Sequence, residues 1–187
     1  MKSLNRYITE ALNMTDVNII VGRFQPFTEG HKKCADYVYD KTGVPTVLCV
    51  VDTKKVDDKH PFLTKDIEGM FDDIVKKDPN IIGWVRVKSA DIVANTEILK
   101  ANNFIPVSWS CGTDRFQSYD RMARNYSKMA GLPEDFRAIE IKRGDDDISA
   151  TRVRKALLSD DKKEYEASMP EYLYGYYEVL KQLISQN

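Results

Sequence analysis

The 187-residue sequence is poor in cysteine and has no long apolar run. Its three cysteines, Cys34, Cys49 and Cys111, do not form the Cys-x-x-Cys spacing that is typical of zinc and redox sites. No apolar stretch approaches the roughly 20 residues that a bilayer-spanning helix needs, and the N-terminus lacks the apolar centre of a secretory signal. We therefore expect a protein of a reducing compartment, cytoplasmic and with no membrane partner.

The sequence also lacks an excess of one charge. It contains 28 basic and 29 acidic residues, a formal net charge of -1, without a long block of one sign. A broad electrostatic footprint for DNA or RNA is therefore not expected, and we predict no nucleic-acid partner. There is no internal repeat and no low-complexity segment. At this length, with 42% hydrophobic residues, the chain can bury a sizeable core.

Short apolar segments with β-propensity alternate with amphipathic helical patterns. This rhythm predicts an α/β fold, a Rossmann-like doubly wound parallel sheet of about five strands with helices on both faces and a C-terminal helix. We expect residues 1–15 to be an N-terminal extension, 16–160 the main domain and 161–187 a helical tail of that domain. The predicted strands are 17–21, 45–51, 82–87, 105–110 and 137–141, and the predicted helices are 29–41, 64–77, 92–102, 114–130, 149–158 and 170–184.

The segment GRFQPFTEGH, residues 22–31, directly follows the first predicted strand. It reads as a tight turn into a helix N-terminus, which presents backbone N–H groups to a phosphate. Gly22 has no Cβ to hinder a ligand, and Thr28 stands where an N-cap belongs. His31 begins the apolar face of the helix. Without the surrounding motif, His31 would be a core or capping side chain.

A second segment, ISATRVR at residues 148–154, stands at the other end of the main domain. Ser149 can cap a helix whose N–H groups and positive dipole end attract phosphates. The guanidinium groups of Arg152 and Arg154 can grip phosphate oxygens in a bidentate way. By itself the segment could equally be a capped amphipathic helix with solvated arginines.

Together these segments resemble the GRFQPFHxGH and ISSTxxR signatures of the nucleotidyltransferase superfamily. The first is most similar to archaeal-type nicotinamide-mononucleotide adenylyltransferases, although Thr28 is a variant also found in the pantetheine-phosphate branch. SCGTDR, residues 110–115, is similar to the G-x-D element of the same pocket, or it merely caps a helix. The resemblance implies a catalytic set of His31, Thr28 and Arg154 and a nucleotide-binding set of Gly22, Arg23, Phe24, Gly112, Asp114, Ile148, Ser149, Thr151 and Arg152.

The resemblance also implies the reaction and its partners. A phosphate of the acceptor would attack the α-phosphorus of ATP and expel pyrophosphate, with Mg²⁺ carried mainly by the triphosphate. Nicotinamide mononucleotide is the expected acceptor; phosphopantetheine, a CTP-dependent reaction and a non-catalytic nucleotide-binding protein are the alternatives. HPFLT, residues 60–64, resembles the Asn-Pro-Phe-Thr segment of the archaeal-type enzymes with one residue inserted and the following Glu-Arg missing, which leaves the acceptor open.

Three further features have two interpretations each. Asp145, Asp146 and Asp147 are interpreted as a solvated loop before a helix, and we predict no metal site formed by the protein alone. The tyrosine-rich tail is expected to pack in the core or against a second subunit, so the sequence does not decide whether the protein forms a homo-oligomer. The opening residues 1–12 form an amphipathic pattern that fits a peripheral helix. They also resemble capsid-targeting peptides of T4-like phages, with Glu10 as the cleavage site, which would place the protein in virions.

Overall fold

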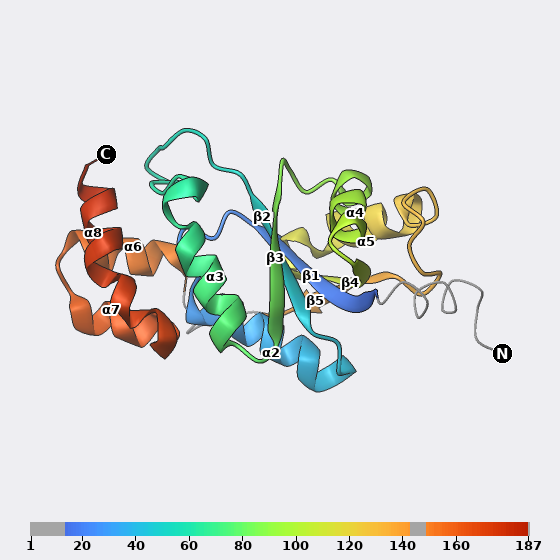
Figure 1. Cartoon of the computed structure of the whole chain (residues 1–187), viewed down its shortest axis with the longest axis horizontal. Helices are drawn as coiled ribbons and strands as arrows, with labels where there is room; N and C mark the ends of the chain where they lie inside the picture. Colours follow the sequence, from blue (N-terminus) through green and yellow to red (C-terminus); the bar gives the residue numbers. More distant parts are fainter. Residues whose placement is uncertain (1–13, 143–148, 187) are drawn as a thin grey trace.

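The computed structural model describes residues 14–142 and 149–186. Ile148, the three aspartates 145–147 and the opening segment with Glu10 lie outside the described residues. Within them, one parallel sheet has the strand order β3-β2-β1-β4-β5 (Figure 1). Its strands are β1 (Thr15–Gly22), β2 (Thr46–Val51), β3 (Ile81–Val87), β4 (Phe104–Gly112) and β5 (Arg137–Ile141). The α/β Rossmann-like fold expected from the sequence is confirmed.

Helices cover both faces of the sheet (Figure 1). The helices α4 (Ile92–Ala101) and α5 (Thr113–Tyr126) share one hydrophobic cluster with one face. Those on the other face are α2 (Glu29–Thr42), α3 (Glu68–Lys77), α6 (Ala150–Leu158), α7 (Lys162–Ser168) and α8 (Tyr177–Ser185), with the 3-10 helices η1 (Thr64–Asp66) and η2 (Glu171–Tyr176). Because β2 is covered on both faces, its sequence TVLCVV is apolar at every position after Thr46.

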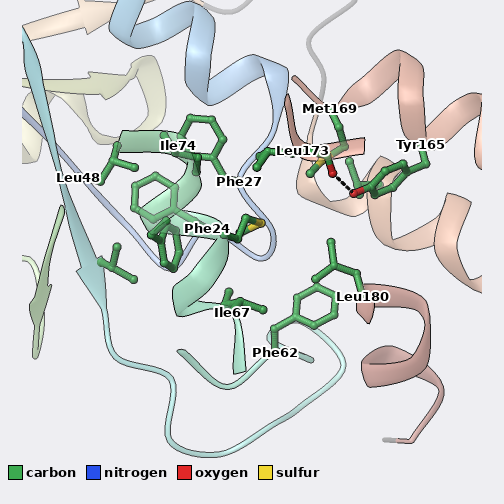
Figure 2. Close-up of a cluster of buried hydrophobic side chains, with 14 of the residues drawn as sticks. Phe24, Phe27, Leu48, Phe62, Ile67, Ile74, Tyr165, Met169, Leu173 and Leu180 are labelled. Atoms are coloured by element: carbon green, nitrogen blue, oxygen red, sulfur yellow. Dashed lines mark hydrogen bonds between the residues drawn. The ribbon is translucent and has the colours of Figure 1, made fainter. Parts of the chain in front are cut away.

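The C-terminal helices join the same core as the first turn (Figure 2). Tyr165, Leu173 and Leu180 are completely buried in one cluster with Phe27 and Phe62. The Tyr165 hydroxyl donates to the Leu173 carbonyl at 3.0 Å, so its polar atom is satisfied inside the cluster. The turn after β1 therefore packs in the same core as α6, α7, η2 and α8.

The predicted helices differ from the observed ones at three places. The predicted helix 64–77 is divided into η1 and α3 at Ile67, and the predicted helix 114–130 ends as α5 at Tyr126. The tail 170–184 begins as η2 after Pro170 and becomes α-helical only in α8. Helix α7 was not predicted, because KKEYEAS has little apolar pattern and is defined by the Asp161 carboxylate, which accepts from the Glu164 N–H.

Among the described residues, no helix combines the length and the apolar character that crossing a membrane requires.

Candidate functional site

The site lies where the direction of the chain across the sheet reverses. From β1 the chain proceeds to β2 and β3 on one side, and it then returns to form β4 and β5 on the other side of β1. Ligands of open parallel sheets bind beyond the carboxyl ends of the strands at such a switch point. A cavity of about 530 Å³ occurs here, lined by the ends of β1 and β4 and by the segments that follow β1, β2 and β3. Its size suits a nucleotide-sized ligand.

The turn after β1 is shaped by an aromatic ring that folds back over the strand end. Phe24 has a left-handed backbone with φ of 49°, which is uncommon and costly for a residue other than glycine. Its buried ring contacts His31 edge-on, with the centroids 5.1 Å apart. A Cβ at Gly22 would lie 3.4 Å from this ring, which is van der Waals contact, so the ring packs directly over the end of β1.

His31 is fixed by the residue that begins its own helix. Thr28 is the N-cap of α2, and its backbone N–H donates to His31 Nδ1 at 3.0 Å. The Thr28 hydroxyl oxygen lies 2.9 Å from the same nitrogen. Because Nδ1 accepts the backbone hydrogen bond, the proton of the neutral ring is on Nε2. His31 lines the cavity, so it brings an N–H donor to that wall.

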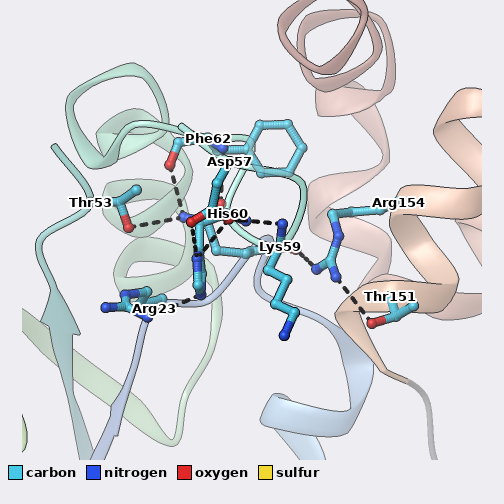
Figure 3. A network of polar contacts seen from close by, with 9 residues as sticks. Arg23, Thr53, Asp57, Lys59, His60, Phe62, Thr151 and Arg154 are labelled. Atoms are coloured by element: carbon cyan, nitrogen blue, oxygen red, sulfur yellow. Dashed lines mark hydrogen bonds and ion pairs between the residues drawn. The ribbon is translucent and has the colours of Figure 1, made fainter. Parts of the chain in front are cut away.

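A second histidine stands over the same turn (Figure 3). The Arg23 Nη1 lies 3.0 Å from His60 Nε2, and His60 Nδ1 lies 3.0 Å from the nearer carboxylate oxygen of Asp57. Both Arg23 and His60 line the cavity. The hydrogen bond from His60 holds the pKa of the Asp57 carboxyl below its ordinary value. Three side chains from two segments of the chain therefore form a continuous polar row at the cavity.

The opposite wall comes from β4, α5 and the segment after β3. Gly112 ends β4 and is the N-cap of α5, while Asp114 is exposed in the first turn of that helix with Arg115 Nε 3.5 Å from its carboxylate. Lys88 follows β3 on the same cavity. Burial raises the pKa of the Cys111 thiol to about 11, so this cavity residue is a neutral thiol at physiological pH.

The second motif stands beside the first one but does not line the cavity. Ser149 caps α6 by accepting the Arg152 N–H at 3.3 Å. Arg154 donates to the Gln25 carbonyl at 2.8 Å and to the Thr151 hydroxyl at 3.0 Å (Figure 3). Burial lowers the pKa of Arg154, against the opposing effect of the Asp57 carboxylate. Although 129 positions separate Arg154 from Gln25, the two motifs are thus in direct contact.

Arg152 points to another partner. Its guanidinium forms an ion pair with the Glu164 carboxylate of α7, and this bond lowers the pKa of Glu164. Glu164 also accepts from the Ser168 hydroxyl, so its carboxylate is held by its own helix. Arg152, which the resemblance assigns to nucleotide binding, is therefore paired with a carboxylate.

The cavity brings together only part of the expected set. Its lining includes Gly22, Arg23, Phe24, His31, Gly112 and Asp114, whereas Thr28, Ser149, Thr151, Arg152 and Arg154 are not part of it. Three basic lining residues were not in the expected set, namely His60, Lys88 and Arg115. His60 begins the HPFLT segment, and Lys88 directly follows a predicted strand, where ligand-binding residues of a parallel sheet are found.

The described residues contain no group of three or more His, Cys, Asp or Glu side chains that could hold a metal ion.

Comparisons with known proteins find similarity of structure and not of sequence. No family model matches the chain, and no curated protein matches its sequence. Two structures of Plasmodium falciparum nicotinic acid mononucleotide adenylyltransferase, complexed with NaAD and with APC, are similar to it with TM-scores of 0.57 and 0.58. Each is 15% identical in sequence, and the match covers 92% of this chain and 98% of the other. At this identity the similarity establishes the fold.

Proposed function

We propose that this protein is a nucleotidyltransferase that joins the nucleotidyl group of ATP to a phosphorylated acceptor, nicotinamide mononucleotide, and releases pyrophosphate. The observation that carries the proposal is the contact between the two motifs. Arg154 of ISATRVR donates to the carbonyl of Gln25 in GRFQPFTEGH, next to Phe24 on the cavity wall. Two segments that we assign to phosphate binding, distant in the sequence, are thus in contact beside one cavity at the switch point.

The proposed reaction needs no protein nucleophile. An oxygen of the acceptor phosphate attacks the α-phosphorus, the bond from that phosphorus to the β-phosphate oxygen breaks, and the electron pair leaves with pyrophosphate. The attacking oxygen is already anionic at neutral pH. Catalysis then consists of holding the two phosphates in line and stabilising the negative charge that develops on the leaving group.

We assign the central role to His31. Thr28 holds Nδ1 through its backbone N–H, so Nε2 carries a proton that can be donated to the phosphates without reorientation of the ring. The contacts of the His31 ring with Phe24 and Phe27, at 5.1 and 5.4 Å between centroids, hold it in place. Preorganised donors of this kind stabilise a transition state more than a mobile side chain does.

The arginines would supply the remaining charge. Arg23 lies on the cavity wall, while Arg152 and Arg154 lie on α6 against protein partners. We propose that a bound triphosphate competes with Glu164 for Arg152. Arg154 uses two of its N–H groups for the Gln25 carbonyl and the Thr151 hydroxyl, and the triphosphate would bind its other N–H groups. Mg²⁺ would arrive on the triphosphate and offset part of its charge.

The charges of the cavity favour an acidic acceptor. Arg23, Lys88 and Arg115 line it together with one carboxylate, that of Asp114. Three cations against one acid suit a ligand with several phosphates. The mononucleotide assignment follows the GRFQPF sequence, and the similar Plasmodium structures are of an enzyme for nicotinic acid mononucleotide. Phosphopantetheine, and CTP in place of ATP, are retained as alternatives because of Thr28.

The test is a matrix of donors and acceptors scored by pyrophosphate release. ATP and CTP are each combined with nicotinamide mononucleotide, nicotinate mononucleotide, phosphopantetheine and glycerol phosphate in the presence of Mg²⁺. We expect pyrophosphate with ATP and nicotinamide mononucleotide above every other pair. If another pair releases pyrophosphate faster than ATP with nicotinamide mononucleotide, the substrate assignment is wrong. If ATP binds and no pair reacts, the chain is a non-catalytic nucleotide-binding protein.

A further inference from the structure

The segment between β2 and η1 is attached to the first motif by a buried amide. Gln25 Nε2 donates to the Phe62 carbonyl at 2.8 Å, and the Phe62 N–H donates back to Gln25 Oε1 at 2.9 Å. Gln25 is 5% exposed and Phe62 is completely buried. At the other end of the segment the Thr53 N–H donates to the Thr64 hydroxyl at 2.8 Å, which closes the base of the loop. The loop 53–64 therefore has a fixed base beside the turn that carries Arg23.

The tip of this loop fixes the orientation of one imidazole. Asp57 Oδ1 accepts the backbone N–H groups of Lys59 and His60, each at 2.8 Å. The same carboxylate lies 3.0 Å from His60 Nδ1. A carboxylate only accepts, so Nδ1 carries the proton and His60 Nε2 has a free lone pair in the neutral ring. The backbone bonds hold Asp57, and Asp57 in turn holds the ring.

The free lone pair of His60 faces the guanidinium of Arg23. Arg23 Nη1 donates to Nε2 at 3.0 Å (Figure 3). An arginine has five N–H donors in a rigid plane, so one bond to His60 restricts the position of the guanidinium and leaves other donors for a ligand. A flexible, exposed arginine would otherwise lose rotamer freedom on binding a phosphate.

We propose that Asp57 and His60 are positioning residues that aim the Arg23 guanidinium at a phosphate of the bound substrate. The inference rests on the proposed function and names what organises its site. His60 acts on the phosphate through Arg23, and Asp57 acts through His60 by selecting its tautomer. The phosphate belongs either to ATP or to the acceptor, and the substrate whose KM rises in the variants shows which of the two it is.

The variants are His60→Ala, His60→Gln, Arg23→Ala and the double variant Arg23→Ala/His60→Ala. Lys59→Ala is the control, because Lys59 contributes only its backbone N–H to the loop. We expect His60→Ala to raise the KM for one substrate about 10-fold with kcat within about 2-fold, as for other residues that orient a ligand-binding group. His60→Gln retains an acceptor oxygen and should recover most of the loss.

The double variant separates positioning from a general structural effect. If His60 acts through Arg23, Arg23→Ala/His60→Ala has the same KM as Arg23→Ala alone. Multiplicative losses in the double variant, or a His60→Ala KM equal to that of Lys59→Ala for both substrates, overturn the proposal. Unchanged thermal melts of the single variants show that folding is intact.

A binding experiment tests the positioning role of His60 independently of the proposed reaction. Calorimetric titration with ATP and with nicotinamide mononucleotide gives Kd for each variant without turnover. If the protein binds but does not react, a Kd about 10-fold weaker in His60→Ala and recovered in His60→Gln still supports positioning, while the proposed reaction fails. If wild-type protein binds neither nucleotide, both proposals are overturned.

Discussion

At the scale of single residues, the first motif is held together mainly by its own backbone. His31 Nδ1 accepts from the N–H of Thr28, the residue that begins the same helix. This is the arrangement of a capping box, with an imidazole in the place of the usual glutamate or glutamine. The hydroxyl of Thr28 is close to the same ring nitrogen, at 2.9 Å. Thr28 therefore holds the His31 ring through its Nδ1 atom and does not itself line the cavity.

Replacing His31 tests this arrangement. His31→Ala removes the donor on Nε2, and we expect kcat to fall about 100-fold or more, the size typical of one lost hydrogen bond to a transition state. The measurement is the steady-state rate of pyrophosphate release. Lys33→Ala, on the exposed side of the same helix, is the control and should retain kcat within about 2-fold. Full turnover in His31→Ala would remove the role assigned to this residue.

At the scale of elements, the turn after β1 and the loop 53–64 behave as one unit through Gln25. The side chain makes two hydrogen bonds to the backbone of Phe62, and the carbonyl of Gln25 accepts from Arg154 on α6. One residue therefore links three segments that are distant in the sequence. Because Gln25 is buried, removal of its amide leaves the Phe62 N–H and carbonyl without their partner.

We expect Gln25→Ala to lower the free energy of unfolding by about 2 to 4 kcal/mol, since three buried hydrogen bonds are lost, two to Phe62 and one to the Thr53 hydroxyl, and two backbone groups are left unpaired. Urea denaturation measures the change. Gln117→Ala on the exposed surface of α5 is the matched control, with an expected effect within about 0.5 kcal/mol. Equal midpoints for the two variants would show that the link through Gln25 adds no stability.

The sequence predicted the elements where a periodic pattern was strong. Alternation of apolar runs with amphipathic stretches was sufficient for all five strands and for α2, α4 and α6. It failed for α7, whose seven residues are held by a cap and a single buried tyrosine, Tyr165. It also failed for η2, because a 3-10 helix has no apolar periodicity long enough to be distinguished from an α-helix.

The site was predictable only where a motif was contiguous. The residues of GRFQPFTEGH on the cavity wall were identified because local spacing defines a turn and a helix start. His60 and Lys88 follow two different strands and Arg115 lies in the first turn of α5, so only the strand order brings the three together. The sequence also gave no sign of the ion pair between Arg152 and Glu164, because this pair depends on α7, an element that the sequence did not indicate.

At the scale of the whole molecule, the C-terminal helices complete the core beneath the site (Figure 2). Leu173 and Leu180 are completely buried in the cluster that also contains Phe24 and Phe27 of the first turn. The Tyr172 hydroxyl donates at 2.7 Å to the buried carboxylate of Asp78, which precedes β3. We propose that residues 161–187 fold cooperatively with residues 16–160 as one domain.

Leu180→Ala tests this cooperativity. Truncation of a buried leucine costs about 2 to 5 kcal/mol, and the loss should appear in the fluorescence of Trp84 and Trp109, which lie in the sheet. Leu158→Ala is the matched control, because Leu158 is 65% exposed. A lower midpoint in fluorescence and in circular dichroism alike is expected. A fluorescence transition that does not move would mean that the C-terminal helices unfold separately.

The fate of the ATP phosphates tests the proposed reaction most directly. Wild-type protein is incubated with nicotinamide mononucleotide, Mg²⁺ and ATP labelled at either the α- or the γ-phosphorus. We predict that the α-label enters a dinucleotide containing the acceptor and the γ-label enters pyrophosphate, both about 100-fold more slowly with His31→Ala. If the γ-label enters the acceptor or inorganic phosphate, or if the α-label stays in ATP with every acceptor of the matrix, nucleotidyl transfer is contradicted.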